Sequence, residues 1–233
     1  MDFENRHVVV TGGTGSLGTA VLAALLDAGA ICHVPYRSEE ALRRFPHRQN
    51  RRVSLDAVGD LADEAAVMRY YEGLQQLWAS IHLAGTFASA PLAQSDRTLL
   101  MSQLETNLVS AYLCSRAAAL TLRRLAAGGR IVNVAARQAI EPRLGAGSVA
   151  YTIAKAAVGA LTTALGAELA NEGILVNAVA PSILDTPGNR TAMPNAHFDS
   201  WPKVEEVAAT ILFLASPANS VIRGAVVPVY GKS

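Results

Sequence analysis

The stretch "HVVVTGGTGSLGTAVLAALLDAGA", residues 7–30, decides the fold. Its first five residues form a β-branched run typical of a buried strand, and the glycine-rich turn at 11–18 leads into a helical pattern. In that pattern Leu17, Val21 and Leu25 recur at intervals of four, and Gly29 supplies a helix stop. A strand, a glycine turn and a helix in this order are the context that a dinucleotide-binding turn requires.

The same alternation continues along the whole chain. We expect strands at 7–11, 30–34, 53–58, 79–85, 130–135, 174–180 and 225–230. Helical patterns are expected at 16–29, from 38 onward, and at 63–77, 97–126, 149–171 and 204–215. Because parallel strands need crossover connections, this order predicts an α/β fold: one Rossmann-type, doubly wound parallel sheet of about seven strands with helices on both faces. We expect residues 1–233 to form a single domain, with the polar, proline-rich stretch at about 181–203 as an irregular lid loop over the substrate.

Composition narrows the function classes. The 233 residues are 51% hydrophobic and carry a formal net charge of +1, which excludes disorder and gives no attraction to nucleic acid or an anionic membrane. Charges such as Asp27 interrupt the apolar runs, so no membrane span or signal peptide is expected. The five histidines never take metal-ligand spacing, and we assign no metal. Cys32 and Cys114 are expected to be buried free thiols of a cytoplasmic protein whose partner is a small-molecule substrate.

The glycine turn has a specific chemistry. Gly12 would make the tight turn, Gly15 would let the backbone approach a pyrophosphate, and Gly18 would allow close packing of helix on strand. The helix N-terminus then presents N–H groups and a positive dipole end to the phosphates. We expect the cofactor-binding turn to comprise Gly12, Thr14, Gly15, Ser16, Leu17 and Gly18. The alternative is a glycine-rich turn that binds nothing.

The end of the second strand discriminates between cofactors. An acidic side chain there would bind the ribose of NAD, whereas this chain has Tyr36-Arg37-Ser38. Arg37 could pair with a 2′-phosphate and Ser38 could donate a further hydrogen bond. The alternative is a solvated arginine before a helix. We predict NADP(H) as the cofactor, with NAD as the second possibility.

Tyr151 and Lys155 lie four apart on one helix, so both side chains project from the same face. A phenol with a pKa near ~10 is a poor acid or base at neutral pH, and a neighbouring ammonium lowers that pKa. The pair could therefore exchange a proton with a substrate. On spacing alone, an ordinary surface pair explains these residues equally well.

Six motifs occur together in order: "TGGTGSLG" (11–18), "LAG" (83–85), Asn107, "RIVNV" (130–134), Tyr151-x-x-x-Lys155 and "VNAVAPS" (176–182). Over essentially its whole length the chain resembles the short-chain dehydrogenase/reductase family. The resemblance implies that Tyr151 is the acid/base, that Lys155 lowers the pKa of Tyr151 and binds the nicotinamide ribose, and that Asn107 supports a proton relay through water. It also implies further cofactor contacts from Asp60, Leu61, Ala84, Gly85, Pro181, Ile183 and Thr186. The helices at 97–126 and 149–171 carry more apolar residues than one buried stripe requires, for example Val158, Leu161, Leu165 and Leu169. The resemblance implies that the chain pairs through these helices as a homodimer or homotetramer. The alternative is that both helices are simply buried against the sheet.

Three positions depart from the family pattern. Ser16 replaces a glycine, His82 replaces the asparagine that usually braces its strand, and Ala135-Ala136 replaces two serines. The second of those serines usually polarises the substrate carbonyl, and losing such a donor costs about 10²–10³ in rate. Gln138 and Ser148 are the candidates to replace it.

Residues 184–201 resemble the corresponding loop of dihydropteridine reductases, a branch of this family with small residues and no serine at that point. A quinonoid dihydropterin accepts hydride readily and has less need of a polarising hydroxyl. The leading hypothesis is therefore an NAD(P)(H)-dependent oxidoreductase acting on a small carbonyl or conjugated cyclic substrate. The alternative is an NADP-binding sensor or scaffold of the same fold without turnover, which the missing serine favours and the intact Tyr151, Lys155 and Asn107 oppose.

Overall fold

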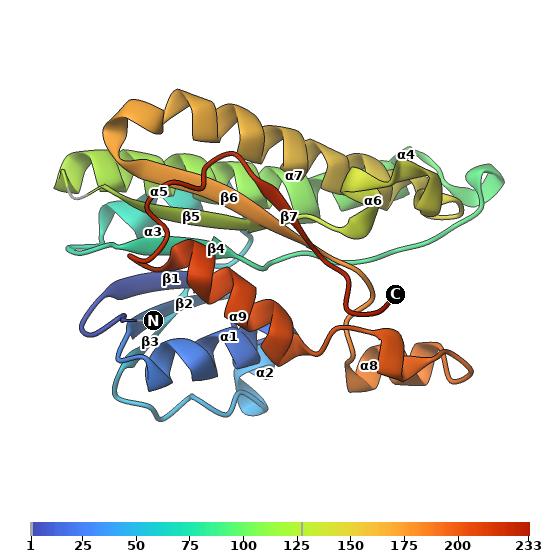
Figure 1. Ribbon diagram of the computed structural model, residues 1–233, viewed down its shortest axis with the longest axis horizontal. Coiled ribbons are helices and arrows are strands. Elements are labelled where there is room, and N and C mark those ends of the chain that lie inside the picture. Colours follow the sequence, from blue (N-terminus) through green and yellow to red (C-terminus); the bar gives the residue numbers. More distant parts are fainter. Residues whose placement is uncertain (1, 127) are drawn as a thin grey trace.

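A computed structural model describes residues 2–126 and 128–233. Seven parallel strands form one sheet in the order β3-β2-β1-β4-β5-β6-β7 (Figure 1). The strands are β1 (His7–Thr11), β2 (Ile31–Tyr36), β3 (Val53–Ala57), β4 (Ala79–His82), β5 (Gly129–Val134), β6 (Ile174–Pro181) and β7 (Val226–Val229). The predicted fold class and all seven strands are confirmed.

Helices cover both faces of the sheet. The α-helices are α1 (Ser16–Asp27), α2 (Glu39–Arg43), α3 (Glu64–Glu72), α4 (Arg97–Gln103), α5 (Ser110–Leu125), α6 (Arg137–Ile140), α7 (Val149–Glu168), α8 (Pro187–Ala192) and α9 (Val204–Ala215). Helices α1 and α9 pack together on one face, while α3, α5 and α7 lie on the other (Figure 1). Leu22, Leu25 and Ile211 are fully buried in the first layer, and Leu122 and Val176 in the second. Each apolar helix stripe thus covers one face of the parallel sheet.

The strand order reverses between β1 and β4. The chain winds outward through β1, β2 and β3, then returns to pair β4 with the other edge of β1, for example Val10 beside Ile81. The carboxyl ends of β1 and β4 are therefore where the order reverses, and ligands of open parallel sheets bind at such a point. The glycine turn after β1 lies at this position.

Two of the predicted helices differ in the structure. The helix expected at 97–126 is divided by a π-helical segment, η2 (Leu104–Val109), between α4 and α5. The helix expected at 63–77 ends at Glu72, where Gly73 is the C-cap. Short 3-10 turns also occur at η1 (Leu92–Gln94), η3 (Pro142–Gly145), η4 (Ala170–Glu172) and η5 (Phe198–Ser200). Asn107 lies inside the π-helical segment, a geometry that often marks functional sites.

The stretch at 181–203 is more ordered than the expected irregular loop. It carries α8, whose N-cap Thr186 accepts a hydrogen bond from the Asn189 amide, and the η5 turn. Its base is closed because the Asp185 amide donates to the Pro202 carbonyl at 2.9 Å and Asp185 pairs with Lys203 in a β-bridge. The segment therefore forms an ordered arm, which carries α8 and projects away from the sheet (Figure 1).

Helix α7 is a long and apolar helix. By length and mean hydropathy (1.3) it is apolar enough to cross a membrane, although no such segment was expected. The helix packs against β5, β6 and β7, and Lys155 is buried within it. A helix buried in the core of a protein can be equally long and apolar. The contact of α7 with the sheet therefore explains its apolar character.

Candidate active site

The glycine turn is shaped as a dinucleotide site needs. Gly12 has φ +67°, and a Cβ there would lie 2.7 Å from the Ala84 amide nitrogen, so the turn packs directly on the segment after β4. A Cβ at Gly18 would lie 2.3 Å from the Gly12 carbonyl oxygen. By contrast, a Cβ at Gly15 would meet nothing closer than 3.4 Å, because this residue faces outward. No side chain of the described residues caps α1, which leaves first-turn N–H groups available to a phosphate.

Arg37, Ser38, Asp60 and Leu61 are also predicted to contact the cofactor. Arg37 and Ser38 are exposed at the end of β2, and Ser38 is the N-cap residue of α2. Asp60 is exposed, but its carboxylate accepts the Ala62 amide at 2.9 Å and so already stabilises its own turn. Leu61 is half-buried against the core on the α3 and α5 side, which agrees with the packing explanation for this residue.

Tyr151, Lys155 and Asn107 meet at the carboxyl ends of β4 and β5. A Cβ at Gly85 would lie 2.6 Å from Asn107 Oδ1 and 3.5 Å from Lys155 Nζ, so a larger residue here would displace the Asn107 side chain. Lys155 Nζ donates to the Val134 carbonyl at 2.8 Å and lies 5.9 Å from the centroid of the Tyr151 ring. Residues distant in sequence thus form one polar cluster beside the glycine turn.

Burial is the main cause of the shifted pKa values of Tyr151 and Lys155. It raises the pKa of Tyr151 to about 12 and lowers the pKa of Lys155 to about 8. The expected lowering of the Tyr151 pKa by Lys155 is not seen, because the ammonium is directed to the Val134 carbonyl and burial outweighs its attraction for a phenolate. Tyr151 is therefore protonated at neutral pH, which is the form that donates a proton.

Asn107 anchors the backbone at Thr86, a contact that was not predicted from the sequence. Its Nδ2 donates to the Thr86 carbonyl at 2.9 Å, and its Oδ1 accepts the Thr86 amide at 3.3 Å. The next residue, Phe87, places its ring against Tyr151, with centroids 4.9 Å apart and planes at 80°. A relay through the Asn107 side chain would compete with these two hydrogen bonds. No periodicity or motif points to Phe87.

The two alanines occupy the position of the usual hydroxyls and are buried. Ala136 lies two residues beyond Val134 and is the N-cap residue of the short helix α6. Ser148 does not replace the hydroxyl as a free donor, because it is buried and bonds the Gly145 carbonyl at 3.3 Å. Gln138 is half-buried on α6 and makes no hydrogen bond with the described residues.

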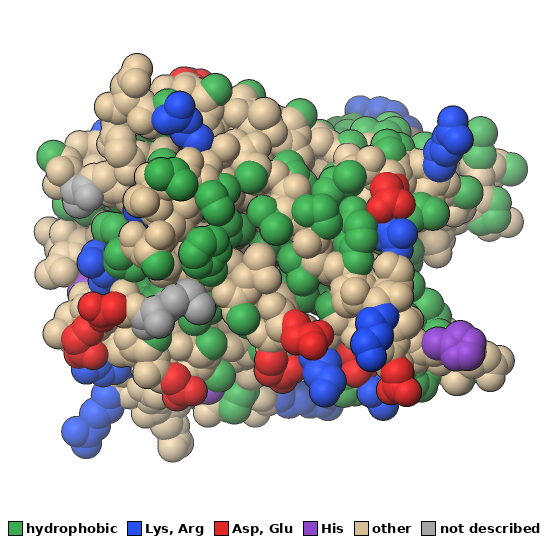
Figure 2. Space-filling model, in the orientation of Figure 1, with side chains coloured by type: hydrophobic (Ala, Val, Ile, Leu, Met, Phe, Trp, Pro, Cys, Tyr) green, Lys and Arg blue, Asp and Glu red, His purple; other side chains and the backbone are tan. Residues whose placement is uncertain are grey.

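The arm at 181–203 brings its predicted residues to the same end of the sheet. Pro181 ends β6, Ile183 is 43% exposed, and Thr186 uses its hydroxyl to cap α8. In Figure 2 the surface is hollowed between this arm and the part of the molecule that carries α4, α6 and α7. Among residues 2–126 and 128–233, no group of three or more His, Cys, Asp or Glu side chains could hold a metal ion.

His82, another departure from the family pattern, is the centre of a buried polar chain. Its Nε2 pairs with the Ser80 hydroxyl at 2.8 Å, which pairs with the Tyr71 hydroxyl at 2.8 Å. Its Nδ1 lies 2.8 Å from Asn133 Oδ1, and Asn133 Nδ2 donates to the Thr162 hydroxyl of α7 at 3.0 Å. These bonds are all satisfied with a neutral imidazole that carries its proton on Nδ1. The chain connects α3, β4, β5 and the helix that carries Tyr151.

Acid should destabilise the protein through His82. Burial lowers the pKa of His82 to about 4, whereas the unfolded chain binds this proton near 6.5. Between these values the unfolded state binds more protons, so stability is complete above pH 6.5 and falls by about 3 kcal/mol as the pH drops towards 4. Urea unfolding of wild type and His82→Asn between pH 4 and 7 measures this slope.

The variant should keep a shallower slope, to which His7 and His33 contribute because burial also lowers the pKa of each. An unchanged slope in His82→Asn would show that His82 is not the group responsible.

Comparison with known proteins decides the family. The family profile described as "Enoyl-(Acyl carrier protein) reductase" matches residues 12–231. The chain is 33% identical to galactitol 2-dehydrogenase of Rhizobium johnstonii (97% of this chain, 94% of the relative). It is also 33% identical to cis-4-hydroxycyclohexanecarboxylate dehydrogenase of Sinomonas cyclohexanicum (98% and 96%). The structure of ElxO with NADP bound superimposes with a TM-score of 0.87 at 26% identity, covering 97% of this chain and 98% of that one.

The chain belongs to the short-chain dehydrogenase/reductase family. As a member of this family it is an NAD(P)-dependent oxidoreductase. The names of the two relatives describe dehydrogenases of a polyol and of a ring alcohol. Neither name mentions a pterin, so the resemblance of residues 184–201 to dihydropteridine reductases gains no support from them.

Proposed function

We propose that this chain reduces small carbonyl or conjugated cyclic compounds with NADPH, and that Tyr151 supplies the proton. The observation that carries the proposal is the cluster of Asn107 and Lys155 at Gly85, directly beside the glycine turn, with the Tyr151 ring next to Lys155. Bound nicotinamide would supply the hydride to the carbonyl carbon. Tyr151 would then donate its phenolic proton to the carbonyl oxygen, and the product is an alcohol.

In this proposal the chain holds the cofactor by the glycine turn, with further contacts from the segments around Asp60, Ala84 and Pro181. Lys155 would bind the ribose of the cofactor. The arm at 181–203 would act as a lid that closes over the substrate and excludes water.

Arg37 would read the 2′-phosphate of NADPH. It is exposed and has no ion pair with the described residues, so its guanidinium is available. Because a charged hydrogen bond contributes about 1.5–3 kcal/mol, Arg37→Ala should raise Kd for NADPH about 10–100-fold and leave Kd for NADH unchanged. Fluorescence titration checks this, with Arg43→Ala in the neighbouring helix α2 as the matched control. A preference for NADH in wild type would contradict the role of Arg37.

The substrate class is inferred from the absence of a second hydroxyl at Ala135-Ala136. A conjugated acceptor, including a quinonoid dihydropterin, needs less polarisation than an isolated ketone. Consumption of NADPH should be measured with a pterin, quinones, enones and simple ketones. The proposal expects turnover of conjugated acceptors first. Tight NADPH binding without turnover of any compound would instead favour the non-catalytic sensor or scaffold.

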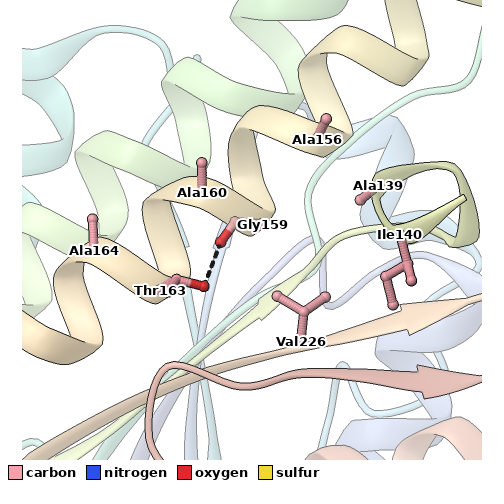
Figure 3. Close-up of a pocket in the computed structure, with 8 residues that line it drawn as sticks. All are labelled: Ala139, Ile140, Ala156, Gly159, Ala160, Thr163, Ala164 and Val226. Atoms are coloured by element: carbon pink, nitrogen blue, oxygen red, sulfur yellow. Dashed lines mark hydrogen bonds between the residues drawn. The ribbon is translucent and has the colours of Figure 1, made fainter. Parts of the chain in front are cut away.

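We also propose that the chain forms a homodimer or homotetramer in the cytoplasm. Val158 and Leu169 are core residues, not surface residues. Tyr112 and Leu120 of α5, however, remain exposed beside the half-buried Leu161 of α7. Figure 3 shows a second hollow with small side chains of α7, which line it together with α6 and β7: Ala139, Ile140, Ala156, Gly159, Ala160, Thr163, Ala164 and Val226. These faces suit a second copy of the chain, and sedimentation velocity would show a single monomeric species if the proposal is wrong.

The two buried free thiols, Cys32 and Cys114, agree with a reducing compartment.

A further inference from the structure

Phe87 is an exposed aromatic side chain placed directly on the proposed proton donor. It follows β4 in the segment that leads to η1, and one edge-to-face contact joins its ring to Tyr151. Despite this contact, 62% of the residue is exposed to solvent. An apolar ring left in water beside a reactive group is a surface that a ligand can cover favourably.

The backbone beside Phe87 is held in place. Both the amide and the carbonyl of Thr86 bond the side chain of Asn107, and the Thr86 hydroxyl lies 3.0 Å from the Thr106 hydroxyl. Asn107 itself is buried in the π-helical segment. Phe87 is therefore presented from a fixed base rather than from the middle of an unanchored loop, and little ordering is needed when a ligand binds.

We propose that Phe87 is a specificity-determining residue that binds a flat ring of the substrate on its exposed face, next to the Tyr151 hydroxyl. The substrate class would be ketones, or the corresponding secondary alcohols, in which an aromatic or conjugated ring adjoins the reacting carbon. This inference rests on the proposed function for the reaction itself.

The physical basis is the preference of aromatic rings for one another. Offset or edge-to-face pairs are worth about two- to tenfold in affinity beyond the area that they bury. A saturated ring of similar size buries comparable area but lacks the quadrupole that favours this geometry. Phe87 should therefore discriminate between two ligands that differ only in the flatness of their ring.

Binding can be tested without turnover. Acetanilide and N-cyclohexylacetamide differ in the ring alone, and neither is a ketone. Their Kd values are measured by NMR titration with and without NADP⁺. Wild type should bind the aromatic compound more tightly, and Phe87→Leu, which keeps an apolar side chain, should weaken it about tenfold with little effect on the saturated one. Phe87→Trp should retain the preference. Leu92→Ala, in the same segment and 78% exposed, is the matched control.

Kinetics give the second readout. With acetophenone and cyclohexyl methyl ketone, Phe87→Leu should raise KM for acetophenone about tenfold and change kcat less than twofold. Equal affinity of wild type for the two ring types, failure of acetanilide to bind, or equal losses in Phe87→Leu and Leu92→Ala would overturn the inference. If binding shows the ring preference but no ketone is reduced, the proposed function fails while the role of Phe87 stands.

Discussion

Replacing Tyr151 by phenylalanine is expected to lower kcat for carbonyl reduction about 10²–10⁴-fold. The substitution removes one oxygen, which is the only atom of this side chain that can donate a proton. The ring remains, so its contact with Phe87 and the burial around Lys155 should be preserved. Steady-state NADPH oxidation measures kcat, and fluorescence titration measures Kd for NADPH, which should change less than about threefold.

Tyr112→Phe is the matched control for this experiment. Tyr112 lies on α5, is 50% exposed and takes no part in the proposed site. Its substitution should leave both quantities at the wild-type value. Retention of more than a tenth of wild-type kcat in Tyr151→Phe would mean that another group or water delivers the proton.

Ala136→Ser is expected to increase kcat/KM for simple ketones at least tenfold. A hydroxyl at this position would supply the carbonyl-polarising donor that other family members carry, and removal of such a donor typically costs about 10²–10³ in rate. Serine is favoured at helix N-caps, and Ala136 is the N-cap residue of α6 in an extended conformation, so the variant should fold. The measurement compares a simple ketone with a quinone in the same assay.

The quinone should gain little, because its carbonyl carbon already accepts hydride readily. Ala135→Ser adds the same hydroxyl one residue earlier, where the chain still pairs with β6 through the Val179 carbonyl. This control should give no gain. No increase for any ketone with Ala136→Ser would show that Gln138 or another group already polarises the carbonyl.

Much of the fold could be predicted because it depends on short-range patterns. β-branched runs separated by helical periodicity identified each strand, and helix α9 begins and ends at the predicted residues, 204 and 215. The pairing of Tyr151 with Lys155 follows from helical spacing. Their meeting with Asn107 and Gly85 needed the family resemblance, because these residues come from separate parts of the chain.

The features that escaped prediction have physical reasons. The π-helical segment around Asn107 shifts the hydrogen bonds by one residue, a change that leaves no mark in composition. The raised pKa of Tyr151 depends on burial and on where the Lys155 ammonium points, which spacing cannot show. Asp60 matches the motif, yet its carboxylate bonds the Ala62 amide in its own turn. The contact between Phe87 and Tyr151 arises from a connection without regular structure.

Hydride transfer itself is the most direct test of the account. NADPH labelled with deuterium at C4 would be incubated with wild type and with aryl ketones and enones, whose reduced carbon retains the label, and the products analysed by mass spectrometry. Incorporation of one deuterium at the reduced carbon, lost in Tyr151→Phe, is the predicted result. Tight NADPH binding with no label in any product would contradict the proposal that this site is an active oxidoreductase.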